Sequence, residues 1–231
     1  MKHLIGLVTL AIACLAYADN SVTDKLNIKL SPQIGQIKEI RSTAIPGVFE
    51  IAVGRQVFYT DSEGRYLIQG QIYDVDTGTN ITQLRVAELS KIDFKLLPLK
   101  QAIKTVHGNG KRQLAVFADP NCGYCKRFEE TLKNVTDVTV YTFVIPILGD
   151  DSKLKSKQLW CSSDRTKAWH DWMLDKKGPN GLGMCDNPLD KNIELAKSLG
   201  IQATPTIYFD DGSSVAGAID KDSLEKNFSG H

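Results

Sequence analysis

Residues 113–135 read QLAVFADPNCGYCKRFEETLKNV. The opening QLAVFAD is a continuous apolar run, typical of a strand that is buried on both faces. A Pro-Asn turn and a Cys-Gly-Tyr-Cys motif follow, after which Phe128, Leu132 and Val135 mark one face of a helix. Residues 137–147 are again mostly apolar and predict a second buried strand. Because a strand, a helix and a strand in this order are joined by a right-handed crossover, we expect the two strands to pair in parallel.

The rest of the C-terminal half continues this alternation of strands and helices. The sequence predicts a mostly helical stretch over 152–176, a Gly/Pro/Asn loop over 178–188, a helix over 189–199, a strand over 206–209, its hairpin partner over 214–217 and a closing helix over 221–228. We therefore expect one α/β module with a helical insertion between its strands.

The two cysteines of the motif lie where a strand ends and a helix begins. Unpaired N–H groups and the helix dipole favour an anion at the first turn of a helix. Cys122 is therefore the expected attacking thiolate, ionising at lower pH than an ordinary thiol. Cys125 lies one turn deeper, where it can close a disulfide with Cys122 and release a mixed-disulfide intermediate. This pair is itself the redox-active group, so we expect no cofactor and no metal.

Three other interpretations of the pair are weaker. A purely structural Cys122–Cys125 disulfide would close a very small loop and gain little chain entropy. A zinc site usually has a second close ligand pair, whereas Cys161 and Cys185 lie far apart in the chain. Covalent haem attachment would need histidine at position 126, which is lysine here.

A second motif lies further along, where Thr204-Pro205 precedes the apolar Thr206-Ile207. Proline at the first position of a strand lacks an N–H without harming the hydrogen-bond ladder, so an ordinary strand-edge proline is one interpretation. The other is a cis Thr204–Pro205 bond beside the cysteines, which would present the Thr204 backbone to an extended substrate strand.

The N-terminus has the pattern of a signal peptide over residues 1–18. Lys2 is followed by an uncharged run that ends in Ala-Tyr-Ala, and the run is too short to span a bilayer. Cys14 offers a lipoprotein alternative, but the usual leucine three residues before a lipidated cysteine is missing. We expect a soluble exported chain in a compartment where thiols oxidise.

The exported chain would carry no net charge. Removing residues 1–18 removes Lys2 and no acid, which leaves 27 basic and 27 acidic side chains. This balance gives no reason to expect nucleic acid or an anionic membrane as a partner. Four cysteines remain, and an even number suggests two disulfides.

Residues 19–80 predict a small α+β domain. The spacing of Val22, Leu26 and Leu30 predicts a short helix over 19–30. Alternating segments between residues 33 and 74, separated by turn residues, predict an antiparallel meander. Because so small a domain buries little apolar surface, we expect a partner subunit to cover more of it.

Helical periodicity returns between the two modules. Apolar residues at helical spacing predict a linker helix over 81–106, interrupted by Pro98. The polar, glycine-rich segment 107–112 breaks the pattern. The predicted organisation is therefore a leader over 1–18, a domain over 19–80, a linker helix over 81–106 and the α/β module over 107–231.

The stretch FADPNCGYCK, residues 117–126, together with Thr204-Pro205 resembles the thioredoxin superfamily. The order of the whole chain is similar to bacterial periplasmic disulfide isomerases of the DsbC type, apart from a short hinge region. The resemblance covers essentially the whole chain after residue 18. It implies a thioredoxin-like catalytic domain with a helical insertion, preceded by a small α+β, cystatin-like dimerisation domain and a linker helix.

The resemblance also assigns roles to single residues. It implies a nucleophile at Cys122, a resolving thiol at Cys125, substrate binding at Gly123, Tyr124, Thr204 and Pro205, and a structural disulfide between Cys161 and Cys185. That disulfide would close a loop of about 25 residues, worth roughly 3 kcal/mol in the chain-entropy model, and would fix the loop over 178–188. A second redox-active pair is the alternative.

The function implied is isomerisation, or reduction, of incorrect disulfides in misoxidised or partly folded exported proteins. The resemblance further implies a periplasmic homodimer that a membrane thiol reductase keeps reduced. One alternative is a net dithiol oxidant, although residues 19–106 would add nothing to that role. Another is a holdase chaperone or adhesion module whose cysteines are secondary.

Overall fold

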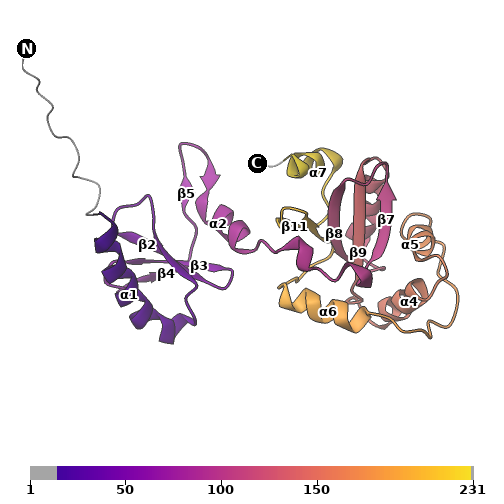
Figure 1. Ribbon diagram of the computed structural model, residues 1–231, viewed down its shortest axis with the longest axis horizontal. Coiled ribbons are helices and arrows are strands. Elements are labelled where there is room, and N and C mark those ends of the chain that lie inside the picture. Colours follow the sequence, from indigo (N-terminus) through magenta and orange to yellow (C-terminus); the bar gives the residue numbers. More distant parts are fainter. Residues whose placement is uncertain (1–14, 230–231) are drawn as a thin grey trace, which may run out of the picture. The chain divides into compact units, whose positions relative to one another are not determined.

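The computed structural model describes residues 15–229, with side chains from Ser21 onward (Figure 1). Cys14 and most of the predicted leader, residues 1–18, lie outside the described residues. In chain order the helices and strands are α1 (Leu15–Ile34), β1 (Glu39–Ser42), β2 (Val48–Val53), β3 (Gln56–Asp61), β4 (Leu67–Ile68), β5 (Tyr73–Asp74), β6 (Thr79–Asn80), α2 (Ile81–Leu89), two 3-10 turns (Phe94–Leu96 and Leu99–Gln101), β7 (Ile103–His107), β8 (Arg112–Ala118), α3 (Gly123–Leu132), β9 (Val138–Val144), α4 (Asp150–Trp160), α5 (Arg165–Met173), α6 (Leu189–Ser198), β10 (Thr206–Phe209), β11 (Ser214–Ala216) and α7 (Lys221–Phe228).

The N-terminal unit, which extends to Ser90, is built on an antiparallel sheet of order β1-β2-β3-β4. Successive residues of β2 point to opposite faces, so Ile51 packs with Leu26 and Leu30 of α1 while Ala52 packs with Leu89 of α2. A helix therefore covers each face of this small sheet, in agreement with the α+β domain that the sequence predicts.

A buried ion cluster fixes α2 to this sheet. Arg85 is almost fully buried, and its Nε lies 2.8 Å from Oε1 of the equally buried Glu50 on β2. The same guanidinium pairs with Glu39 and with Glu88. Because a buried charge is tolerated only when it is paired, this cluster ties α2 to β1 and β2.

The linker helix predicted over 81–106 is wrong beyond Leu89. After α2 the chain forms the two 3-10 turns, and Ile103–His107 is strand β7, antiparallel to β9. Buried Ile103 and Thr105 alternate with exposed neighbours, which is the period of a strand. Pro98 cannot donate a helical hydrogen bond, and pairing with β9 satisfies the backbone beyond it. The second unit accordingly begins at Lys91 rather than at residue 107.

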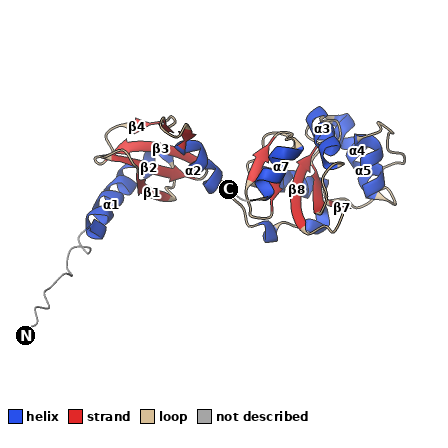
Figure 2. Cartoon of the chain, turned by 90° about the horizontal axis from the view of Figure 1, so that it is seen from above, coloured by secondary structure: helices blue, strands red, loops and turns tan. Residues whose placement is uncertain are grey.

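This C-terminal unit contains a five-stranded sheet of order β11-β10-β8-β9-β7. β8 and β9 pair in parallel, as the strand–helix–strand order predicts, and the other neighbours are antiparallel. Helices surround the sheet (Figures 1 and 2), and α6 and α7 pack on its opposite faces, since Leu224 of α7 lies in one core and Ala196 of α6 in the other. Each face of the sheet has its own hydrophobic core, and alternate residues of β8 contribute to the two. Leu114 and Val116 pack with α3, α4, α5 and α7, whereas Ala115 and Phe117 pack with α6.

The first residues of the C-terminal unit lie against its β10–β11 turn. The Ile92 N–H donates to the Gly212 carbonyl over 3.1 Å, and Lys91 pairs with Asp211 over 3.0 Å. Gly212 has φ +83°, and a Cβ there would lie 2.0 Å from the Ile92 carbonyl oxygen. Only glycine allows both this backbone conformation and this close approach.

One ionisable side chain lies inside the core between α3 and α5. The Glu129 Oε1 accepts a hydrogen bond from the Trp169 indole over 2.6 Å, and Oε2 lies 3.9 Å from the His170 Nε2. Burial raises the pKa of Glu129 to about 7, and the Trp169 hydrogen bond offsets only part of that rise. The carboxyl group therefore keeps its proton in the folded chain at pH values where the unfolded chain has lost it.

We predict that stability falls as pH rises from the usual glutamate range through about 7, because the native state then holds a proton that the unfolded state has released. This group alone should remove on the order of 3 kcal/mol across that window. Glu129→Gln can still accept the indole hydrogen bond and cannot ionise, so its unfolding free energy should exceed the parent's at about pH 8 and approach it at about pH 5. Urea unfolding followed by tryptophan fluorescence gives the unfolding free energies of the parent and the variant at each pH. An equal difference between the two proteins at both pH values contradicts the prediction.

Candidate active site at the start of α3

The first turn of α3 is built around the Cys122 sulfur. Cys122 is the N-cap of the helix, with extended backbone (φ −72°, ψ 119°), and its Sγ accepts a hydrogen bond from the Cys125 N–H over 3.3 Å. Its carbonyl accepts from the Lys126 N–H over 3.1 Å, which begins the helical ladder. The sulfur thus occupies the position where a helix presents unpaired N–H groups and its positive dipole end.

Cys125 lies one turn into the helix and points into the core with Phe128 and Leu132. It is 2% exposed, against 6% for Cys122, and the two thiols are both free in the structure. Burial raises the pKa of Cys125 well above that of an ordinary thiol, and the neighbouring Cys122 sulfur raises it further. Cys125 is therefore held as a neutral thiol next to the more accessible Cys122.

The loop before β10 completes the site from another part of the chain. The Thr204–Pro205 peptide is cis, and the Cys122 thiol donates to the Thr204 carbonyl over 3.3 Å. β10 begins at Thr206, which lies opposite Phe117 of β8 in the sheet. Since β8 leads directly into the cysteine loop, this strand pairing brings two segments that are distant in sequence to one place.

The other two residues with predicted substrate roles lie at the surface beside the sulfur. Gly123 and Tyr124 are exposed, and the Tyr124 side chain is 60% accessible. The Arg127 guanidinium lies 5.2 Å from the centre of the Tyr124 ring. An aromatic ring in this position offers an apolar contact next to the Cys122 sulfur.

Asp119 holds the cysteine loop in place, a role that the sequence analysis missed. The fully buried carboxylate accepts hydrogen bonds from the backbone N–H groups of Asn121, Ile147 and Leu148 and from the Ser152 hydroxyl, over 2.7–2.9 Å. The backbone carbonyl of Asp119 accepts a hydrogen bond from the Cys122 N–H over 3.1 Å. A charged residue that directly ends an apolar strand is the sequence signal that could have revealed it.

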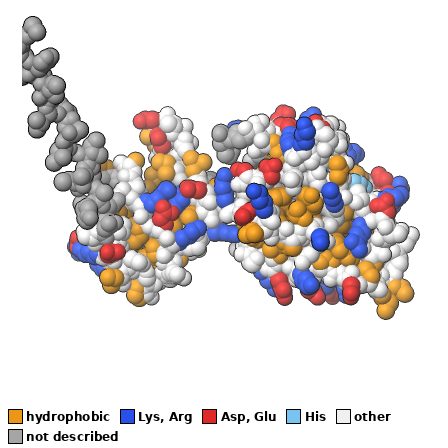
Figure 3. All heavy atoms as spheres, viewed as in Figure 1, with side chains coloured by type: hydrophobic (Ala, Val, Ile, Leu, Met, Phe, Trp, Pro, Cys, Tyr) orange, Lys and Arg blue, Asp and Glu red, His pale blue; other side chains and the backbone are white. Residues whose placement is uncertain are grey.

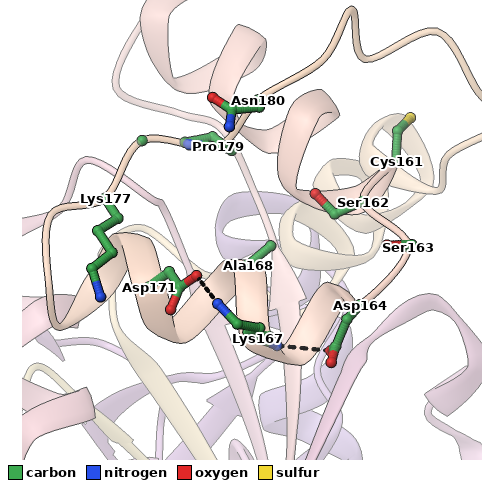
Figure 4. Close-up of a pocket in the computed structure, with 11 residues that line it drawn as sticks. Cys161, Ser162, Ser163, Asp164, Lys167, Ala168, Asp171, Lys177, Pro179 and Asn180 are labelled. Carbon is green, nitrogen blue, oxygen red and sulfur yellow. Dashed lines mark hydrogen bonds and ion pairs between the residues drawn. The ribbon is translucent and has the colours of Figure 1, made fainter.

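Cys161 and Cys185 form a disulfide, with an S–S distance of 2.04 Å. It joins the end of α4 to the loop over 178–188. Cys161 lines a hollow of about 430 Å³ between the end of α4, α5 and this loop. Figure 4 shows the residues that line it, with Lys167 paired with Asp171 across one turn of α5. The structure thus places this pair on the helical insertion and does not bring it to the cysteine loop.

Residues 21–229, whose side chains are described, contain no group of three His, Cys, Asp or Glu side chains placed to hold a metal ion. Among the described helices, none has the length and apolar character needed to cross a membrane.

Comparison with known proteins agrees with this geometry. Residues 16–83 match the family model described as disulfide bond isomerase protein N-terminal domain, and residues 99–229 match that of a thioredoxin-like domain. A thiol:disulfide interchange protein DsbC of Dickeya dadantii is 31% identical over 93% of this chain and 88% of its own length. This chain belongs to the DsbC family. Its C-terminal unit has the thioredoxin-like fold, and the N-terminal unit is the DsbC N-terminal domain.

Two further proteins are more similar in sequence over the regions that match. A probable thiol:disulfide interchange protein DsbC of Bordetella pertussis is 42% identical over 78% of this chain, and the matched region spans 64% of the Bordetella protein's length. The crystal structure of a disulfide interchange protein from Neisseria gonorrhoeae is 44% identical, with a TM-score of 0.55, and the match covers 58% of this chain and 96% of that one.

We predict that Asp119→Asn destabilises the C-terminal unit by about 1–3 kcal/mol, because an amide NH₂ would face an N–H donor that the carboxylate now satisfies. The urea midpoint of the tryptophan signal measures the loss. Asp150→Asn removes the same charge from an almost fully exposed side chain in the first turn of α4 and should cost less, about 0.3–1 kcal/mol. Equal stability of the Asp119 variant and its parent would show that this carboxylate does not hold the loop.

Proposed function

We propose that this chain is a thiol–disulfide interchange enzyme that isomerises incorrect disulfides in exported proteins through Cys122. The observation that carries the proposal is the placement of the Cys122 sulfur at the N-terminus of α3, between the Cys125 N–H and the Thr204 carbonyl. The names of the Bordetella and Dickeya relatives agree with it.

The reaction begins with attack of the Cys122 thiolate on one sulfur of a substrate disulfide. A bond forms between Cys122 and that sulfur as the substrate S–S bond breaks, and the displaced sulfur leaves as a thiolate that takes up a proton. In isomerisation another substrate thiolate then attacks the mixed disulfide, the new substrate S–S bond forms and Cys122 returns as a thiolate. No electrons are gained or lost overall.

Reduction is the second outcome of the same intermediate. Cys125 loses its proton and attacks the Cys122 sulfur, which releases the substrate as a thiol and leaves the Cys122–Cys125 disulfide in the chain. Two electrons have then passed to the substrate. Because burial raises the pKa of Cys125, its thiolate forms rarely and this attack is slow, so the mixed disulfide has time to rearrange.

The surroundings of the sulfur suit an extended protein substrate. We assign Thr204 and Pro205 to backbone pairing with a substrate strand next to Cys122, and Gly123 and Tyr124 to the adjoining contact surface. We assign the Cys161–Cys185 disulfide a structural role, since it anchors the loop over 178–188.

We assign the chain to the periplasm. Because an isomerase needs reduced cysteines in that oxidising compartment, we also assign a membrane thiol reductase as its electron donor. No cofactor is required because the cysteine pair carries the electrons itself. The DsbC N-terminal domain distinguishes this role from that of a net dithiol oxidant, to which an added domain contributes nothing.

We predict that Cys122→Ala loses refolding of scrambled ribonuclease A, whereas Cys125→Ala accumulates a mixed disulfide between Cys122 and the substrate. Refolding activity and non-reducing mass spectrometry measure the two effects. If the Cys122 variant still refolds scrambled ribonuclease at the parent rate, the chain acts as a chaperone whose cysteines are secondary, and the proposal is wrong.

We also propose that the chain forms a homodimer through its N-terminal unit. β4 is the edge strand of that sheet, and its side chains Leu67 and Ile68 are 42% and 53% exposed, next to an exposed Tyr66. Hydrophobic side chains reach the surface of this unit in the space-filling view (Figure 3). An unpaired edge strand with apolar side chains is a ready surface for pairing with a second chain.

Leu67→Asp combined with Ile68→Asp should therefore turn the dimer into a monomer, because two carboxylates would have to be buried against the partner's strand. Sedimentation equilibrium gives the mass of each variant. Leu182→Asp, on an 83% exposed side chain in the other unit, is the matched control and should stay dimeric. A monomeric parent chain, or a double variant that remains dimeric, contradicts this assignment.

A further inference from the structure

Two lysine ammonium groups lie over an aromatic ring that packs behind the cysteine loop. The Trp172 indole N–H donates to the Pro120 carbonyl over 2.6 Å, so the ring is held against the loop that carries Cys122. The Lys126 ammonium lies 4.1 Å from the centre of this ring and the Lys155 ammonium 4.9 Å from it. Lys126 follows Cys125 directly and lies one helical turn from Cys122.

A third lysine contributes to the same field. Burial lowers the pKa of Lys126, and repulsion from Lys176 and Lys155 lowers it further. Neither Lys126 nor Lys176 belongs to any ion pair found among residues 21–229. Lys176 thus lies near enough to repel Lys126, which itself lies over the Trp172 ring, and neither of these two lysines has an acidic partner there.

The acids nearby leave a positive excess. Asp151 pairs with Lys155 and accepts from the Asn121 amide over 2.6 Å, so it balances one of the three charges. Asp171 pairs with Lys167, as Figure 4 shows, and Asp175 pairs with Lys177 over 3.0 Å. Two lysines over the Trp172 ring and the Lys176 charge that repels Lys126 therefore face one aspartate that is already engaged.

The turn that ends α5 fixes the backbone of Lys176. Lys176 has φ +57°, in the left-handed region that favours glycine, just after the C-terminus of α5. The Lys177 N–H donates to the Asp171 carbonyl over 2.9 Å and closes this turn. Lys176 thus holds the left-handed position that ends many helices, where glycine is the usual residue.

We propose that Lys126 and Lys155 over the Trp172 ring, together with the neighbouring Lys176, form a docking site for an acidic segment of the protein that exchanges disulfides with Cys122. The inference rests on the proposed function and names a class of partner for it. Carboxylates next to the partner's reactive cysteine would meet the ammonium groups while its sulfur meets Cys122. Since the chain after residue 18 is formally neutral, such attraction would come from this cluster and not from overall charge.

The test uses two symmetric peptide disulfides that differ only in the two residues flanking each cysteine, which are Glu in one peptide and Gln in the other. The reduced full-length chain reacts with each, and every rate is divided by the rate of that peptide with dithiothreitol, which corrects for intrinsic sulfur reactivity. We expect the corrected rate to favour the Glu peptide about tenfold at about 10 mM salt and to become equal near 1 M, as screening shortens from about 30 Å to about 3 Å.

Variants locate the effect. Lys126→Gln and Lys176→Gln should each lower the Glu/Gln rate ratio about threefold, the size expected for one charge pair near water. Lys133→Gln removes the same charge at the far end of α3, where Lys133 pairs with Glu130, and should leave the ratio as it is. Lys176→Gly should lower the ratio while raising the thermal midpoint, because glycine relieves the backbone.

Equal corrected rates for the two peptides at low salt would overturn the inference, as would a ratio that Lys126→Gln leaves unchanged or that Lys133→Gln lowers equally. If the parent chain fails to exchange with the Gln peptide at all, the proposed function itself is contradicted, so the two failures are distinguishable.

Discussion

The site depends on one interaction, the hydrogen bond from the Cys125 N–H to the Cys122 sulfur at the start of α3. It places the sulfur where the helix offers unpaired donors and a positive dipole end, and it turns the next cysteine into the core. The two thiols of one short motif therefore have different environments. Burial raises the pKa of Cys125, while Cys122 is slightly more exposed, at 6%, and contacts the Thr204 carbonyl.

The rest of the C-terminal unit holds this arrangement rigid. The pairing of β8 with β10 brings the Thr204–Pro205 loop to the cysteines, and the Asp119 carboxylate ties the cysteine loop to the segment before α4. Trp172 supports the same loop from α5 through the Pro120 carbonyl. The reacting sulfur is thus positioned by β8, β10, α3 and α5 together, which explains why a motif of four residues needs a whole domain around it.

Sequence patterns predicted most of this where periodicity and chemistry agree. QLAVFAD predicted a strand buried on both faces, and β8 feeds both cores of the sheet. The prediction of a helix over 81–106 was wrong beyond Leu89, because residues at helical spacing, such as Ile103 and Val106, can also lie in a strand. Pairing with β9 makes this end of the segment strand β7. Asp119, Glu129 and the lysines around Trp172 act through contacts between distant segments, which spacing along one chain does not reveal.

The most direct test of the account is the rate of alkylation of each cysteine of the reduced chain at mildly acidic pH, with peptide mass spectrometry to identify the labelled residue. The account predicts that iodoacetamide labels Cys122 faster than an unstructured cysteine peptide and well before Cys125. Labelling of Cys122 no faster than that of the peptide, or labelling of Cys125 first, would contradict it.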